Sequence, residues 1–148
     1  MTPTTELDAD TATRLRVSIG RLARGLNATV AGAGLTPTQR TVLGSVARQG
    51  PVRPADLAER ENLNPTMLSR VVGKLDDAGL VTRLPDPQDR RAAQVEVTPA
   101  GRELQDQIRA ERTRALTDGL DRLPDDLADS VLAALPALEA LSHELTDR

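Results

Sequence analysis

Apolar residues recur every three or four positions through much of the chain, which places their side chains on one face of a helix. The first such stretch covers about residues 10–31, and a break follows at residues 32–35. Its apolar positions are Leu15, Ile19, Leu22, Leu26 and Val30. The pattern predicts a long N-terminal helix with one apolar face.

Two further helices begin at a capping residue followed by proline. Thr36 precedes Pro37, and Gln39 completes a capping box. Asn64 precedes Pro65 in the same way, and Gly79 is expected just beyond the end of that second helix. A short helix is predicted between them, at about residues 54–61. The apolar stripe of the helix from Asn64 consists of Leu68, Val71, Val72 and Leu75.

The hydrophobic period changes after Gly79. The sequence Leu-Val-Thr-Arg-Leu at residues 80–84 is typical of a strand, and residues 93–97 alternate between apolar and polar side chains. Residues 85–91 between them are polar, charged and stiffened by two prolines. This segment is therefore predicted to be a small β-hairpin with a charged tip.

Helical spacing returns after the hairpin. Thr98-Pro99 starts a long helix, and Pro124 opens a last one in which Pro136 should cause a kink or an early end. The apolar face of the last helix consists of Leu127, Val131, Leu135, Leu138, Leu141 and Leu145. A coiled-coil seam or a core within one chain could use this face. We favour a dimer interface, because so apolar a peripheral helix needs a partner.

Together these elements predict a fold that is mainly α with a small β-hairpin wing. The order helix, turn, helix, hairpin over residues 36–101 is that of a winged helix-turn-helix lobe. Residues 8–31 and 102–146 are expected to be dimerisation helices, and residues 1–148 to form a single domain.

Composition narrows the possible functions. The chain has no cysteine and no aromatic residue, and His143 is its single histidine. Disulfides, thiolate metal sites and base stacking on aromatic side chains are therefore excluded. The acidic residues of the C-terminal third lack the spacing of a calcium loop. We expect no cofactor and no metal site, and the absence of a nucleophile–base pair or a phosphate loop argues against an enzyme.

Charge and hydropathy bear on partners and location. The net charge is −3, but residues 36–101 carry nine basic and eight acidic side chains, whereas residues 102–148 carry six and eleven. The positive charge of the middle segment would have to gather on one face to bind nucleic acid. No apolar run reaches the roughly 20 residues that a membrane helix needs, and no signal peptide is visible, so a cytoplasmic protein is expected.

The helix from Asn64 carries candidate DNA contacts opposite its apolar stripe. Thr66 and Arg70 lie on the far side of the helix, with Ser69 and Lys74 beside them. An arginine at such a position can donate two hydrogen bonds to guanine in the major groove. A solvated helix face would explain the same residues. Met67 is interpreted as a packing residue of this helix.

The predicted hairpin tip carries a second candidate contact. Arg90 and Arg91 follow Asp89, and a guanidinium at a loop tip suits the narrow, negative minor groove. The carboxylate of Asp89 could hold the guanidinium of Arg91 in a fixed direction. A surface ion pair in a solvated turn is the alternative interpretation.

Several stretches within residues 55–102 carry a family resemblance. They are Leu57-Ala58, Asn64-Pro65-Thr66-Met67-Leu68-Ser69-Arg70-Val71-Val72, Leu75, Gly79-Leu80-Val81-Thr82-Arg83, Asp89-Arg90-Arg91-Ala92 and Val97-Thr98-Pro99-Ala100-Gly101-Arg102. They resemble the MarR family (multiple-antibiotic-resistance regulators). The Asp-Arg-Arg wing followed by Val-Thr-Pro-Ala-Gly is the most specific mark.

The resemblance implies a two-fold dimer that binds double-stranded DNA at a palindromic operator. It implies that Asp89 orients Arg91 into the minor groove and that the helix from Asn64 enters the major groove. The expected DNA-binding residues are Asn64, Pro65, Thr66, Ser69, Arg70, Lys74, Asp89, Arg90 and Arg91.

The resemblance also implies a pocket for a small-molecule effector. Any such pocket would be aliphatic here, with Arg16, Ser18 and Asn27 as candidate polar contacts or as plain surface residues. The expected function is that of a transcriptional regulator that acts as a ligand-responsive repressor. A protein-binding winged-helix module without DNA contact is the competing hypothesis, and the acidic C-terminal third favours it.

Overall fold

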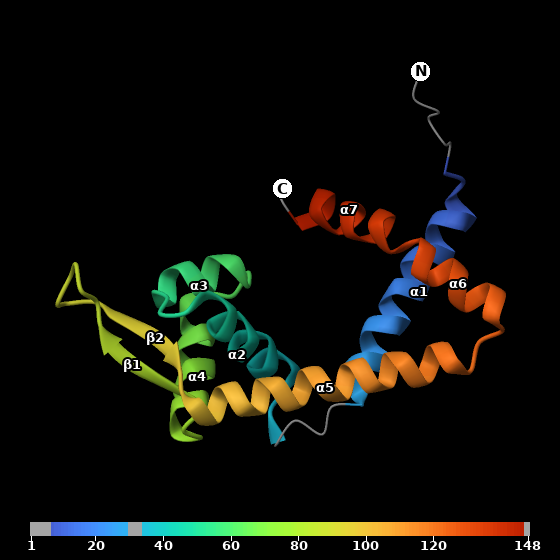
Figure 1. The fold of residues 1–148 in the computed structure, drawn as a ribbon. Helices are drawn as coiled ribbons and strands as arrows, with labels where there is room; N and C mark the ends of the chain where they lie inside the picture. Colours follow the sequence, from blue (N-terminus) through green and yellow to red (C-terminus); the bar gives the residue numbers. More distant parts are fainter. Residues whose placement is uncertain (1–6, 30–33, 147–148) are drawn as a thin grey trace. The chain divides into compact units, whose positions relative to one another are not determined.

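The computed structural model describes residues 7–29 and 34–146. Its elements, drawn in Figure 1, are α1 (Ala9–Ala28), α2 (Pro37–Gln49), α3 (Pro54–Arg60), α4 (Pro65–Asp77), β1 (Val81–Pro85), β2 (Ala93–Val97), α5 (Pro99–Asp121), α6 (Asp125–Ala133) and α7 (Leu135–Thr146). The chain divides into two compact units, one ending at Arg112 and the other beginning at Thr113. The predicted fold class, mainly α with a small hairpin, is confirmed.

Local capping explains where α2 and α4 begin. The hydroxyl of Thr36 accepts from the backbone N–H of Gln39 at 3.2 Å, and the Gln39 side chain accepts from the Thr36 N–H at 2.9 Å. The Asn64 side chain accepts from the backbone N–H of Met67 at 2.8 Å. Gly79 lies just past the end of α4 with φ 72°, a value that glycine adopts without strain. The predicted helix starts and the glycine stop are thus confirmed.

An aliphatic core joins α2, α3, α4 and the hairpin. Its fully buried hydrophobic members are Val42, Leu43, Val46, Leu57, Leu68, Leu75, Val81 and Val95. The stripe predicted on α4 is buried in this core. Because α4 packs by this stripe, its opposite face is left to solvent.

The two strands pair antiparallel, in register from Val81 opposite Val97 to Pro85 opposite Ala93. Val52, just before α3, adds an isolated bridge to Val95 on the free edge of β2. The hairpin and the loop 86–92 between its strands are called the wing below. The wing is therefore fixed to the segment before α3 as well as to α4.

A close backbone contact joins the wing to the start of α5. The hydroxyl of Thr98 donates to the carbonyl of Gly79 at 2.6 Å and accepts from the N–H of Gly101 at 3.1 Å. Gly101 is buried against the carbonyl of Leu80, where a Cβ atom would lie 2.0 Å from the oxygen. Only glycine fits at this point.

The N-terminal helix ends earlier than the pattern predicts, at Ala28. Val30 and Ala31, which were expected to belong to it, lie outside the described residues. Leu15, Ile19 and Leu22 of α1 have exposed side chains. None of the helices in the described ranges is both long and apolar enough to cross a membrane.

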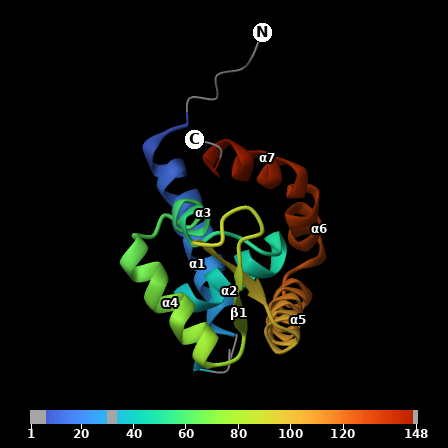
Figure 2. The ribbon, with the colours of Figure 1, turned by 90° about the vertical axis from the view of Figure 1, so that its left-hand side faces the viewer.

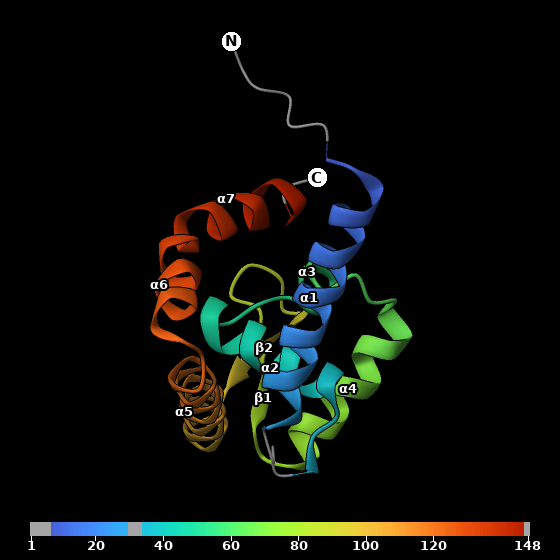
Figure 3. The same cartoon turned by 90° about the vertical axis from the view of Figure 1, so that its right-hand side faces the viewer.

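In the second unit, the predicted last helix is divided into α6 and α7, which run in different directions (Figure 3). Pro136 stands in the first turn of α7, where its missing N–H is tolerated. The Ala134 N–H still bonds to the Ser130 carbonyl at 3.1 Å, and the break follows. The kink expected at Pro136 is confirmed.

Candidate DNA interface

Helix α4 presents a polar face of short and basic side chains. All six residues predicted for DNA binding at this helix are exposed: Asn64, Pro65, Thr66, Ser69, Arg70 and Lys74. The buried stripe fixes the rotation of the helix about its axis, so this face points away from the core. The prediction for Met67 is wrong: the residue is 48% exposed and does not pack in the core.

The wing loop ends in a turn built by Asp89. Its carboxylate accepts from the backbone N–H of Arg91 at 2.9 Å, and its carbonyl accepts from the N–H of Ala92 at 3.0 Å. Arg90 and Arg91 are exposed at this tip. The sequence prediction placed the carboxylate on the Arg91 guanidinium, whereas the contact described here is with the Arg91 backbone. Asp89 thus fixes the turn from which the Arg91 side chain extends.

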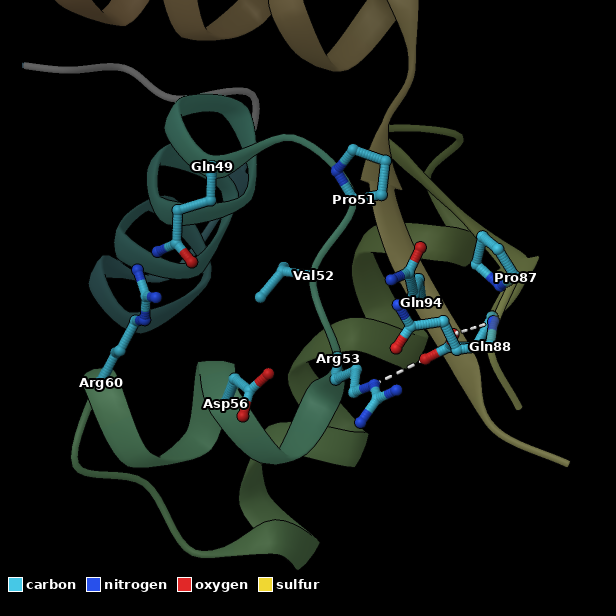
Figure 4. Close-up of a pocket in the computed structure, with 10 residues that line it drawn as sticks. Gln49, Pro51, Val52, Arg53, Asp56, Arg60, Pro87, Gln88 and Gln94 are labelled. Carbon is cyan, nitrogen blue, oxygen red and sulfur yellow. Dashed lines mark hydrogen bonds and ion pairs between the residues drawn. The ribbon is translucent and has the colours of Figure 1, made fainter. Parts of the chain in front are cut away.

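The wing base holds an ion pair that the sequence did not reveal. The Nε atom of Arg53 donates to Oδ2 of Asp86 at 2.5 Å, as Figure 4 shows beside Gln88. The side chain of Asp86 is 1% exposed. Hydrogen bonds from Arg53 and from the Gln88 N–H hold the pKa of Asp86 below its ordinary value of 3.8. The two partners are 33 positions apart, and no local signal links them.

The two candidate contact regions belong to adjoining elements of one lobe. Helix α4 packs against β1, and Figure 2 shows α4 and the wing side by side. An exposed helix of suitable width next to a hairpin with arginines at its tip can contact a major groove and the adjoining minor groove. Fold and surface together define a winged helix-turn-helix protein of the DNA-binding class.

Comparison with known proteins identifies the family. Residues 35–93 match the MarR family. The chain is 34% identical to an uncharacterized HTH-type transcriptional regulator of Mycobacterium leprae, over 93% of this chain and 96% of the relative. The chain belongs to the MarR family of transcriptional regulators, whose members bind DNA.

Two further comparisons agree with this assignment. The HTH-type transcriptional repressor MdtR of Bacillus subtilis is 29% identical over 46% of this chain and 44% of its own length. The crystal structure of a putative transcriptional regulator of Pseudomonas aeruginosa superimposes with a TM-score of 0.79 and 29% identity, covering 93% of this chain and 97% of that one.

The candidate effector contacts on α1 are surface residues, and one of them bonds to α5. Arg16 and Ser18 are exposed on α1. The side-chain oxygen of Asn27 accepts from Arg112 of α5 at 2.9 Å, which ties the end of α1 to α5. Within the described ranges, no group of three or more His, Cys, Asp or Glu side chains could hold a metal ion.

Proposed function

We propose that this MarR-family regulator binds a specific double-stranded DNA sequence through α4 and the wing. The observation that carries the proposal is the exposure of all nine candidate residues on two adjoining elements of one lobe. Thr66, Ser69 and Arg70 contact base edges in the major groove. Arg90 and Arg91 enter the minor groove next to it. Lys74 lies one turn beyond Arg70 and contacts the phosphate backbone.

The acting species is a homodimer. Exposed apolar side chains recur along α1 and through both helices of the second unit. In α6 and α7 they are Leu127, Val131, Leu132, Leu135, Leu138, Leu141 and Leu145. Exposed large apolar side chains that recur along peripheral helices are typical of a protein interface. Sedimentation at micromolar concentration should give a dimer, and a monomer alone would contradict this part of the proposal.

A two-fold dimer reads a two-fold DNA site. The operator is therefore an inverted repeat whose half-site centres lie about 10 bp apart or at a multiple of that spacing. The protein acts as a repressor that a small-molecule effector releases from DNA. The repressor role of the Bacillus subtilis relative supports this direction of regulation. A genome-wide binding profile would identify both the operator and the regulated genes.

The decisive experiment compares Arg70→Ala with Lys74→Ala. Fluorescence anisotropy is measured across a salt series on the operator and on a scrambled duplex. Arg70→Ala should cost roughly 1–3 kcal/mol on the operator and much less on the scrambled duplex, because a base contact is lost. Lys74→Ala should weaken both equally and lower the salt slope by about one unit, because a phosphate contact is lost.

The outcomes separate the alternatives. Equal losses on both duplexes for Arg70→Ala would make Arg70 a phosphate contact and would remove the base-reading role of α4. If neither variant changed binding to any DNA, α4 would not enter the groove. The winged lobe would then serve as a protein-binding module, whose affinity would depend little on salt.

A further inference from the structure

The loop of the wing is fixed to the start of α3 through two neighbouring residues. Val52 exchanges two backbone hydrogen bonds with Val95 of β2, at 3.0 and 2.8 Å. Arg53 follows at the N-cap position of α3 and makes the 2.5 Å ion pair with Asp86. Val52 thus holds β2, and Arg53 holds Asp86, the first residue of the loop between the two strands.

Asp86 is the point at which the loop is anchored. Oδ2 of its carboxylate accepts from Arg53, and Oδ1 accepts from the N–H of Gln88 at 2.8 Å. Its own N–H donates to the carbonyl of Ala92 at 3.1 Å, across the neck of the loop. The tip residues Asp89 to Arg91 follow within five positions. A displacement at Asp86 therefore moves the tip.

Hydrophobic packing does little to hold the loop in place. A cavity of about 640 Å³ lies between the end of α2, α3 and the loop. Most of the side chains around it are polar, including Gln49, Gln88 and Gln94 (Figure 4). The buried carboxylate of Asp86 has one cationic partner among the described residues. Loss of that partner would leave a buried charge unpaired, and the loop would move to hydrate it.

We propose that Arg53 is a positioning residue that sets the direction of the wing through Asp86, and so determines how the regulator discriminates sequences flanking the core of its operator. The inference rests on the proposed function, because it assigns the wing to the minor groove. It predicts that Arg53 acts on DNA through the wing. A guanidinium in direct contact with a phosphate is the alternative, since the Arg53 side chain is 45% exposed.

Four variants separate these two roles. Arg53→Gln removes the cation, and Arg53→Lys keeps the charge. Asp86→Asn removes the carboxylate charge but keeps an oxygen for the Gln88 N–H. Arg60→Gln is the matched control, because Arg60 is the last residue of α3, the helix that Arg53 precedes, and lines the same cavity, while the described ion pair uses Arg53 alone.

Two measurements are made on the full-length protein. The first is amide hydrogen exchange of Gln88 and Ala92 without DNA. The second is anisotropy on duplexes that share the operator core and differ in A/T-rich or G/C-rich flanks, with a scrambled-core duplex measured beside them. Arg53→Gln and Asp86→Asn should each speed exchange by about tenfold or more. Both variants should reduce the difference in affinity between duplexes with A/T-rich and G/C-rich flanks. They should leave the discrimination between operator-core sequences unchanged. Arg53→Lys should recover part of both effects, and Arg60→Gln should change neither.

Each contrary result has a definite meaning. Exchange in Arg53→Gln at the wild-type rate would overturn the proposal. So would an unchanged flank preference in either Arg53→Gln or Asp86→Asn. If Arg53→Gln weakened all duplexes equally while Asp86→Asn tightened binding, Arg53 would be a phosphate contact. If the wild type bound no duplex specifically, the proposed function would fail, and unchanged exchange would still separately reject the positioning role.

Discussion

Replacement of Gly101 by alanine tests the contact between α5 and the wing. The new Cβ would lie 2.0 Å from the Leu80 carbonyl oxygen and 2.9 Å from Cγ2 of Val97. Nonbonded carbon contacts are optimal at about 3.5–4.0 Å, so one backbone segment must move by roughly 1 Å or more. The Leu80 carbonyl cannot move freely, because it accepts from the N–H of Thr98 at 3.0 Å.

The expected loss of stability follows from two opposing effects. Overpacking of this kind costs about 1–3 kcal/mol or more, and the better helix propensity of alanine returns at most about 1 kcal/mol. Because the clash is with backbone atoms, the cost of overpacking should lie at the upper end of this range. Gly101→Ala should therefore lower the free energy of unfolding by about 2 kcal/mol. The corresponding fall in Tm is about 4–8 °C for a chain of this size.

Gly119→Ala provides the matched control. It makes the same substitution in the same helix, but a Cβ there meets no atom within 4 Å. It should stabilise the protein by about 0.5–1 kcal/mol, because alanine loses less backbone entropy than glycine. Urea titrations at one protein concentration measure the free energy of unfolding of the wild type, of Gly101→Ala and of Gly119→Ala. If Gly101→Ala were as stable as Gly119→Ala, the close approach of α5 to Leu80 would be refuted.

Three further predictions concern the cap, the wing tip and the wing base. Thr36→Ala should lower the free energy of unfolding by about 1 kcal/mol in urea titrations, because the capping box of α2 is lost. Asp89→Ala should weaken operator binding in anisotropy, as Arg91→Ala does, although it removes a negative charge; tighter binding would reject an orienting role. The pKa of Asp86 lies below 3.8 in the folded state. Its ion pair therefore stabilises the fold above that value and is lost as the pH falls through the lowered pKa. Arg53→Gln should raise the Asp86 midpoint in an NMR titration, and an unchanged midpoint would contradict the assignment.

The sequence by itself determined the elements and most of their ends. Capping residues such as Thr36 and Asn64 act on backbone groups three positions away, so their effect can be read locally. The stripe on α4 is equally local, because helical periodicity fixes which side chains share a face. The same helical spacing also predicted which polar side chains of α4 are exposed. The resemblance of residues 55–102 to one family came from the same local stretches, and comparison confirmed it.

Tertiary structure decided what hydrophobicity and local spacing left open. Met67 adjoins the buried stripe in sequence, yet its place on the helix leaves it outside the core, so hydrophobicity alone misassigned it. The Asp89 carboxylate bonds to backbone where the sequence suggested a guanidinium. Arg53 and Asp86 meet only because Val52 pairs with β2 and brings the start of α3 to the wing base. The contact between Arg53 and Asp86 joins residues 33 positions apart, and no periodicity or motif encodes a distance that only the folded backbone sets.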